Sequence, residues 1–301
     1  MKFTTWLKRA VVFLVLFFAI DFAISEAMLK GLNRYFGLHS QSDMFINGSS
    51  MAMAGFDKTN LEHSLHKKIA FYTRTGVSLQ DRSAMLHHYF DASTATTDIA
   101  VFEVNPLLFS KKFTAANVYM LFLPFIDEPS MSDFVRSNTD AKEFWIRKFI
   151  RCSRYNTDMI ALAIKGYTRN YENQKNLVLD LNALEGLKSE ANTVKVELDP
   201  QKIKLFKDCV ALMKQHCNKV ILVNMPVFVT KLKTFKTDEY QEYMDVVQQV
   251  ASASGQIHFL DLNQPDIIDN ASYFSDPLHL NASGQVEVTK AMTQFMEKNN
   301  L

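Results

Sequence analysis

The sequence predicts an α/β domain built on a mostly parallel sheet of five strands. Five short apolar segments have the length and composition of strands that are covered on both faces, namely 43–47, 68–73, 99–104, 219–225 and 257–261. Segments with helical periodicity lie between or after them, at 78–90, 201–216, 237–252 and about 283–298. Strands that alternate with helices form parallel sheets through right-handed crossovers. We therefore expect the five segments to share one sheet.

The length and composition fit one large domain and narrow the range of partners. The chain has 301 residues, of which 48% are hydrophobic, and this is enough for a sizeable core. Its formal net charge is only +1. Nucleic-acid-binding domains carry a basic patch or a strong positive charge, so we expect no nucleic-acid partner.

The three cysteines give no sign of a disulfide framework or a metal centre. Cys152, Cys209 and Cys217 form no Cys-x-x-Cys pair, and their number is odd. A bridge between Cys209 and Cys217 is compatible with their spacing, but three mostly buried thiols are the simpler interpretation. No cluster of histidine and carboxylate residues completes a metal site, so we expect neither a metal nor another cofactor.

The N-terminal 40 residues are predicted to anchor the chain in a membrane. Lys8 and Arg9 precede an apolar stretch that runs from 10 to 24 and is interrupted only by Asp21. This stretch is slightly short of the about 20 residues that span a bilayer, and basic residues on the leading side favour a cytoplasmic N-terminus. We expect an uncleaved signal anchor over residues 1–40, which crosses the inner (cytoplasmic) membrane once and leaves the rest of the chain in the periplasm. A cleaved signal peptide and a buried amphipathic helix are the alternatives.

Residues 41–301 are predicted to form the α/β domain, with a helical insertion at about 107–198. This insertion is far longer than a simple crossover, and 118–126 is its most apolar stretch. A small core of its own, packed at the edge of the sheet, is the favoured interpretation. A lid over the site and a surface that rests on the membrane are the alternatives; nine residues are too few to span a bilayer.

Two short segments at opposite ends of this domain carry the residues of a serine nucleophile system. Gly48-Ser49-Ser50 follows the first predicted strand, where a tight turn exposes a hydroxyl group. Asp276 lies three residues before His279, so one loop or helical turn delivers a base together with the carboxylate that orients it. Ser50 is the first candidate nucleophile and Ser49 its competitor, and helix capping by both serines is the alternative. The second glycine of Gly-x-Ser-x-Gly is missing, which disfavours an α/β-hydrolase elbow.

These motifs resemble the SGNH (GDSL-type) hydrolase superfamily, and in particular its membrane-anchored, extracytoplasmic bacterial branches that act on cell-envelope glycans. The resemblance rests on Gly48-Ser49-Ser50 with Gly55-Phe56-Asp57, and on Asp276-Pro277-Leu278-His279-Leu280-Asn281 near the end of the chain. It implies a flavodoxin-like three-layer sandwich, in which Ser50 is the nucleophile, His279 the base and Asp276 the group that orients the base.

The same resemblance implies an oxyanion hole made of the backbone amide of Ser50, a glycine and an asparagine. Gly76, just past the second strand, fits the glycine position, and Asn105, just past the third strand, is the best asparagine. The sequence around Asn105 departs from the usual Gly-x-Asn-Asp pattern. Loss of one oxyanion donor lowers turnover by about 100- to 1,000-fold, so activity would be weak or absent if Asn105 does not face the site.

Two functions are compatible with these residues. The first is a serine-dependent esterase or O-acyltransferase that acts on an acylated cell-envelope glycan, or on another ester, through a Ser50 acyl-enzyme. Water as the acceptor makes it an esterase, and a sugar hydroxyl makes it a transferase. The second function, which the departure at Asn105 favours, is that of a non-catalytic protein of the same fold that binds glycan or assists a membrane acyltransferase.

Overall fold

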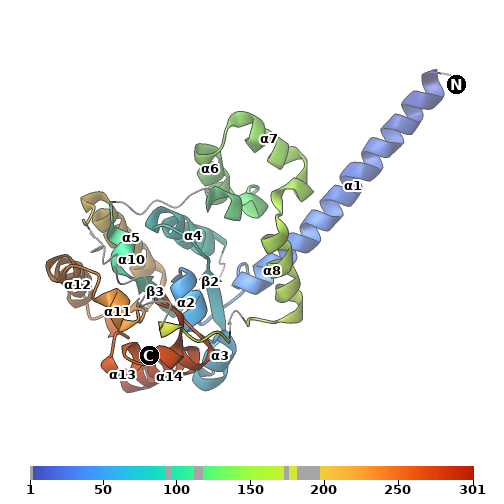
Figure 1. The fold of residues 1–301 in the computed structure, drawn as a ribbon. Helices are drawn as coiled ribbons and strands as arrows, with labels where there is room; N and C mark the ends of the chain where they lie inside the picture. Colours follow the sequence, from blue (N-terminus) through green and yellow to red (C-terminus); the bar gives the residue numbers. More distant parts are fainter. Residues whose placement is uncertain (1–2, 93–96, 112–117, 173–175, 182–196) are drawn as a thin grey trace. The chain divides into compact units, whose positions relative to one another are not determined.

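The chain forms two compact units, each built from two separate stretches of sequence (Figure 1). The computed structural model describes the chain apart from residues 1–2, 93–96, 112–117, 173–175 and 182–196. Residues 1–36 and 117–170 make up one unit, which we call the helical unit. Residues 37–116 and 171–301 make up the other, which we call the α/β unit.

The α/β unit is built on a five-stranded sheet in the order β2-β1-β3-β4-β5. Its strands are β1 (Met44–Gly48), β2 (Ile69–Thr73), β3 (Ile99–Val104), β4 (Lys219–Asn224) and β5 (Ile257–Asp261). Every neighbouring pair is parallel. The predicted fold class and all five predicted strands are therefore confirmed, and the order is that of a flavodoxin-like doubly wound sheet. In such a sheet, ligands bind beyond the carboxyl ends of the strands.

Helices cover both faces of this sheet. Among its described residues, the helices of the unit are α2 (Ser50–Gly55), α3 (Lys58–Leu65), α4 (Leu79–Ala92), α5 (Pro106–Phe109), α10 (Pro200–His216), α11 (Val229–Leu232), α12 (Thr237–Ser252), α13 (Pro265–Ile268) and α14 (Ala282–Lys298). On one face, Phe45 of β1 stacks on Tyr89 of α4 at 3.7 Å between ring centroids, and Phe102 of β3 lies against Phe206 of α10. On the other face, α3 and α14 pack on apolar strand residues in a buried cluster that includes Ile46, Leu61, Val101, Val288 and Met292.

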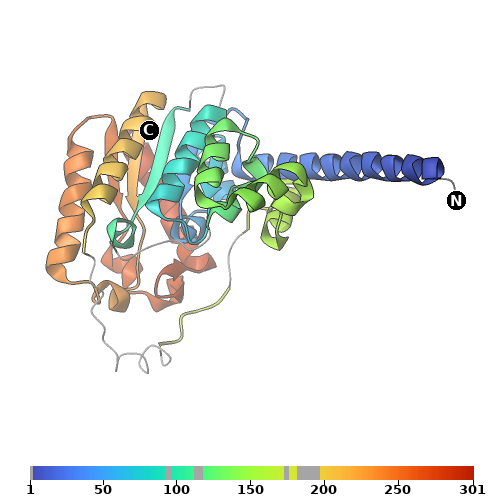
Figure 2. The same ribbon diagram turned by 90° about the horizontal axis from the view of Figure 1, so that it is seen from above.

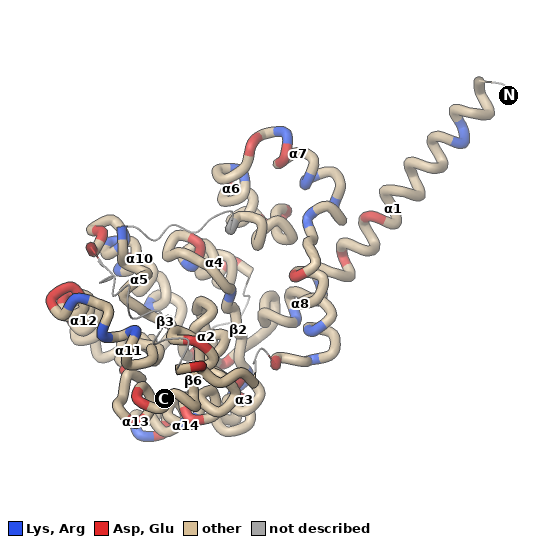
Figure 3. Tube along the Cα trace, viewed as in Figure 1, with Lys and Arg blue, Asp and Glu red and all other residues tan. Residues whose placement is uncertain are grey.

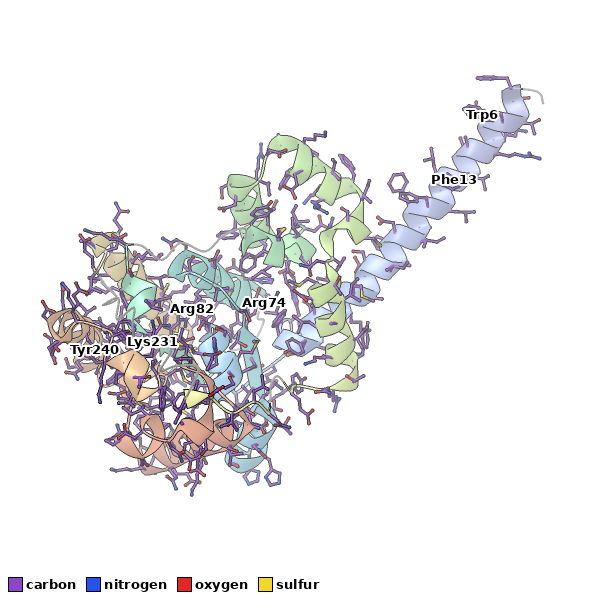
Figure 4. All side chains as sticks on the ribbon, in the orientation of Figure 1. Trp6, Phe13, Arg74, Arg82, Lys231 and Tyr240 are labelled. Atoms are coloured by element: carbon purple, nitrogen blue, oxygen red, sulfur yellow. The ribbon has the colours of Figure 1, made fainter. Side chains whose placement is uncertain are left out.

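The helical unit contains the N-terminal helix α1 (Phe3–Phe36), which is long and apolar enough to cross a membrane. Figure 1 and Figure 2 both show α1 as one straight, uninterrupted helix. Its first half exposes large apolar side chains, among them Trp6 and Phe13 (Figure 4), and carries few charges (Figure 3). Its second half packs on α8 (Thr157–Thr168) with the backbones in close approach, because a Cβ atom at Gly166 would lie 1.9 Å from the carbonyl oxygen of Gly31.

The predicted insertion at 107–198 is divided between the two units. Residues 118–126 form two short 3-10 helices, and Phe122, Phe125 and Ile126 are buried in the helical unit. That unit continues through α6 (Pro129–Asn138), α7 (Ala141–Phe149) and the 3-10 helix η3 (Arg151–Arg154) before α8. Leu179 belongs to the α/β unit, where its N–H donates a hydrogen bond to the Phe274 carbonyl.

All three cysteines are free thiols, and Cys209 and Cys217 are buried. Burial raises the pKa of Cys209 to about 11 and that of Cys217 to about 12. At pH 8 about one thiol in a thousand or fewer is then the reactive thiolate. We expect both thiols to resist iodoacetamide at pH 8 in the folded chain and to react after unfolding, as measured by peptide mass spectrometry. Rapid alkylation of either thiol in the folded chain would contradict this expectation.

Candidate active site

The two adjacent serines after β1 have different environments. Ser49 is the N-cap of α2, and its hydroxyl oxygen accepts a hydrogen bond of 3.2 Å from the Met51 N–H. Ser50 is the first residue of the helix, and its Oγ lies 2.8 Å from Nε2 of His279. This distance is within the range in which a base removes the proton of a nucleophile. The geometry therefore separates the capping serine from the candidate nucleophile.

Asp276 and His279 face each other across a short antiparallel hairpin of β6 (Phe274–Asp276) and β7 (His279–Leu280). The carboxylate of Asp276 accepts the backbone N–H groups of Leu278 at 2.8 Å and of His279 at 3.0 Å. Its Oδ2 also lies 2.8 Å from Nδ1 of His279. A ring that donates from Nδ1 to a carboxylate leaves Nε2 as an acceptor, which is the tautomer that a general base needs. The hairpin therefore orients both residues before any substrate arrives.

Ser50, Gly76 and Asn105 each follow the carboxyl end of one of three neighbouring strands. Ser50 follows β1, Gly76 follows β2 and Asn105 follows β3, and β1 lies between the other two strands. Gly76 has a positive φ of 74°, and a Cβ atom there would meet nothing within 4 Å, so its backbone borders open space. The sheet order thus places both predicted oxyanion residues on strands that flank the Ser50 strand.

The side chain of Asn105 is engaged in local hydrogen bonds. Its oxygen accepts the Leu108 N–H at 3.0 Å, which caps α5, and its Nδ2 donates to Oε1 of Glu103 at 2.7 Å. A side-chain amide has a second N–H, which is the group that the oxyanion role requires. The contact with Glu103 orients this amide.

The buried carboxylate of Glu103, which the sequence analysis did not identify, accepts a hydrogen bond from the turn that carries Ser49 and Ser50. Glu103 lies in β3, and its Oε2 accepts the Ser49 N–H at 2.5 Å while its Oε1 accepts from Asn105. The signal in the sequence was a single carboxylate inside an otherwise apolar strand, two residues before Asn105. Glu103 therefore connects the nucleophile turn to the candidate oxyanion residue.

Arg82 of α4 compensates this carboxylate. Its side chain is fully buried within the α/β unit, and its Nη1 lies 3.9 Å from Oε2 of Glu103. Its guanidinium donates to Oδ1 and to the carbonyl of Asn47, and to the carbonyl of Glu103. Burial lowers the pKa of Arg82 from its ordinary value, and the negative charge of Glu103 opposes this effect. Arg82 thereby ties β1 to β3 directly beneath the site.

Glu103→Gln is expected to lower the free energy of unfolding by about 3 kcal/mol. Glutamine leaves the buried Arg82 guanidinium without its carboxylate. Its NH₂ group would also face the Ser49 N–H or the Asn105 amide, so that two hydrogen-bond donors meet. Urea unfolding of the full chain in detergent would measure the change. The control is Asp208→Asn, which breaks the exposed Lys204–Asp208 pair of 2.8 Å and is expected to change stability by less than about 1 kcal/mol. Equal losses in the two variants would contradict the role of Glu103.

The described part of the chain contains no group of three or more His, Cys, Asp or Glu residues that could hold a metal ion. Separately, a serine hydroxyl, an imidazole and a carboxylate form a hydrogen-bonded series at this site. The Asp276 side chain is 49% exposed and that of His279 31%, so both residues are in contact with solvent.

Comparison with known proteins gives one family and several distant structures. Residues 174–297, which contain Asp276 and His279, match the family model described as DltD protein. A search of the curated proteins gives no match.

Three solved structures illustrate the distant likeness. A protein from Streptococcus pneumonia described as a platelet activating factor is 12% identical, covers 96% of this chain and 99% of its own, and has a TM-score of 0.46. A lipase/acylhydrolase from Enterococcus faecalis is 10% identical, and the match covers 85% of this chain and 95% of that protein, with a TM-score of 0.43. A family two carbohydrate esterase from Clostridium thermocellum, solved with cellohexaose, is 7% identical. The match covers 85% of this chain and 63% of that protein, with a TM-score of 0.41.

Proposed function

We propose that this chain is a serine-dependent esterase or O-acyltransferase of the SGNH hydrolase superfamily, a proposal that the match of residues 174–297 to a family model supports. The observation that carries the proposal is the hydrogen-bonded series Ser50–His279–Asp276, with 2.8 Å between Ser50 Oγ and His279 Nε2. Ser50 is the nucleophile, His279 the general base and Asp276 the group that holds the imidazole in its acceptor tautomer.

The reaction would proceed through an acyl-enzyme. Ser50 Oγ attacks the ester carbonyl while His279 Nε2 takes the hydroxyl proton, and Asp276 stabilises the resulting imidazolium. The negative charge that develops on the carbonyl oxygen is held by the backbone N–H of Ser50, with Gly76 and the Asn105 amide as the other donors. Collapse of this intermediate breaks the bond to the alcohol, which leaves with the proton from His279. Water or a sugar hydroxyl then attacks the acyl-Ser50 ester in the same manner.

The proposed substrate is an acylated glycan of the cell envelope. Support comes from α1, whose exposed apolar half suits a single-pass anchor in the inner membrane with the N-terminus in the cytoplasm. The α/β unit would then act in the periplasm, on the side of the membrane that faces the glycans of the cell envelope. The exposure of Asp276 and His279 to solvent also suits a polymeric substrate better than a closed pocket would.

A non-catalytic role is the second candidate. Asn105 is occupied as the cap of α5 and by its bond to Glu103, so its availability as an oxyanion donor depends on a single N–H. Without that donor, the same fold would bind glycan or assist a membrane acyltransferase.

Labelling with a fluorophosphonate probe distinguishes the two candidates. The full chain in detergent is treated with the probe, and the modified peptide is identified by mass spectrometry. An activated serine nucleophile predicts label on Ser50 and none on Ser49. A folded wild-type chain that takes no label would favour the non-catalytic protein.

Asp276→Asn is expected to lower kcat by about 1,000-fold. This loss is smaller than the about 10,000-fold loss of kcat that the same substitution causes where the triad aspartate is buried. Asparagine retains an oxygen for the Leu278 and His279 N–H groups, but its NH₂ group disfavours the Nδ1-protonated tautomer of His279. The Asp276 side chain is half exposed, so water replaces part of the lost stabilisation. Kinetics on an aryl acetate would measure the effect, with KM little changed. A kcat equal to that of the wild type would remove Asp276 from the mechanism.

A further inference from the structure

Helix α7 and its C-cap residue Ile150 expose an apolar face to solvent. Trp145, Ile146, Phe149 and Ile150 are 50%, 42%, 66% and 37% exposed, while Phe144 on the opposite side is buried. The rings of Trp145 and Phe149 stack with 5.8 Å between centroids. We call these four exposed side chains the aromatic face. Exposed apolar patches of this kind mark surfaces that meet a membrane or another protein.

Hydrogen bonds fix the end of α7 to one point on α1. The carboxylate of Asp21 accepts the backbone N–H groups of Arg151 at 2.7 Å and of Cys152 at 2.8 Å, at the start of η3. The Arg151 guanidinium lies 4.6 Å from the ring centre of Phe22 and pairs with Glu26 at 2.9 Å. Because η3 follows α7 directly, the C-terminal end of α7 is held close to residues 21–26 of α1.

This point coincides with the outer boundary of the predicted span. A span of about 20 residues that begins between Phe3 and Lys8 ends between about residues 22 and 27. Figure 1 shows α7 running crosswise to α1, and Figure 2 shows that α1 lies in the plane of Figure 1. If α1 crosses the bilayer along its normal, α7 lies flat against the surface of the membrane.

We infer that the aromatic face of α7 inserts into the headgroup region of the bilayer that α1 spans. Tryptophan and phenylalanine on a short amphipathic helix are suited to this boundary, where the ring is apolar and the indole N–H stays wet. Lys142 is exposed one turn before Trp145, where it meets anionic headgroups. The inference rests on α1 as the anchor, which is part of the proposed function, but not on the chemistry at Ser50.

The chain contains two tryptophans, so each can be observed alone. Trp6→Phe leaves Trp145 as the reporter, and the full chain is reconstituted in vesicles of phosphatidylethanolamine and phosphatidylglycerol. We expect a blue-shifted emission, quenching by brominated lipids and little quenching by iodide. Ile146→Ser with Phe149→Ser should reverse these effects, whereas Val286→Ser, at a position 53% exposed on α14, should not.

The reverse variant, Trp145→Phe, uses Trp6 to report on the anchor. Quenching of Trp6 by brominated lipids, without quenching of Trp145, overturns the inference and leaves the anchor intact. If brominated lipids quench neither Trp6 nor Trp145, both the inference about α7 and the role of α1 as an anchor are overturned. Trp145 shielded from iodide but untouched by brominated lipids would indicate a protein contact, such as a second copy of the chain, and also overturns it. Fluorophosphonate labelling of the same preparations tests the chemistry at Ser50 separately.

Discussion

Ser50→Ala is expected to lower the turnover of an ester substrate by about 10⁴- to 10⁶-fold, the range found when the nucleophile of a serine triad is removed. The hydroxyl at 2.8 Å from His279 Nε2 is the group that forms the acyl-enzyme, and alanine has no substitute for it. Initial rates on an aryl acetate, with the full chain in detergent, would measure the loss. Residual activity would come from binding and the oxyanion donors alone.

Ser49→Ala is the matched control for this substitution. It removes the hydroxyl that caps α2 and is expected to reduce stability by about 1 kcal/mol, while turnover stays within a few-fold of the wild type. The Ser49 N–H keeps its bond to Glu103 in this variant. If Ser49→Ala abolished turnover and Ser50→Ala did not, the roles of the two serines would be reversed.

His279→Ala is expected to lower turnover nearly as much as Ser50→Ala, because the nucleophile and its base act as one unit. A hydroxyl without a base remains protonated at neutral pH and attacks an ester slowly. The double variant Ser50→Ala with His279→Ala should therefore be no slower than either single variant. Rates measured on the same substrate would test this non-additivity.

Two results would contradict the assignment of His279. The exposed His63 on α3 provides a control, and His63→Ala should leave turnover unchanged. A double variant whose rate falls by the product of the two single effects would show that the residues act independently. Such independence is incompatible with proton transfer between Ser50 and His279.

Local composition was sufficient to predict most of the elements. Strands buried on both faces must be continuous apolar runs, and the five runs in the sequence match β1 to β5 within one or two residues at each end. The membrane-length helix is likewise a matter of composition, since it requires only a long apolar stretch. Asp276 and His279 were recognisable because three residues separate them, so one short hairpin holds both.

Contacts between distant residues were not accessible in this way. Ser50 and His279 are 229 positions apart, and their 2.8 Å contact depends on strand order and on the packing of the β6–β7 hairpin against α2. The choice between Ser49 and Ser50 depends on which hydroxyl faces that hairpin and which caps the helix. The support from Glu103 and Arg82 depends on the burial of two charges, which only packing can compensate.

The division of residues 107–198 between the two units likewise depends on contacts between distant residues. Their apolar stretch indicated a core, but the sequence contains no information on which partner that core meets. Sequence alone predicted the strands, the candidate anchor and the chemical groups of the candidate site, because burial and periodicity are properties of neighbouring residues. The tertiary structure decided which of these groups meet, because their distances are set by the packing of segments that lie far apart in the chain.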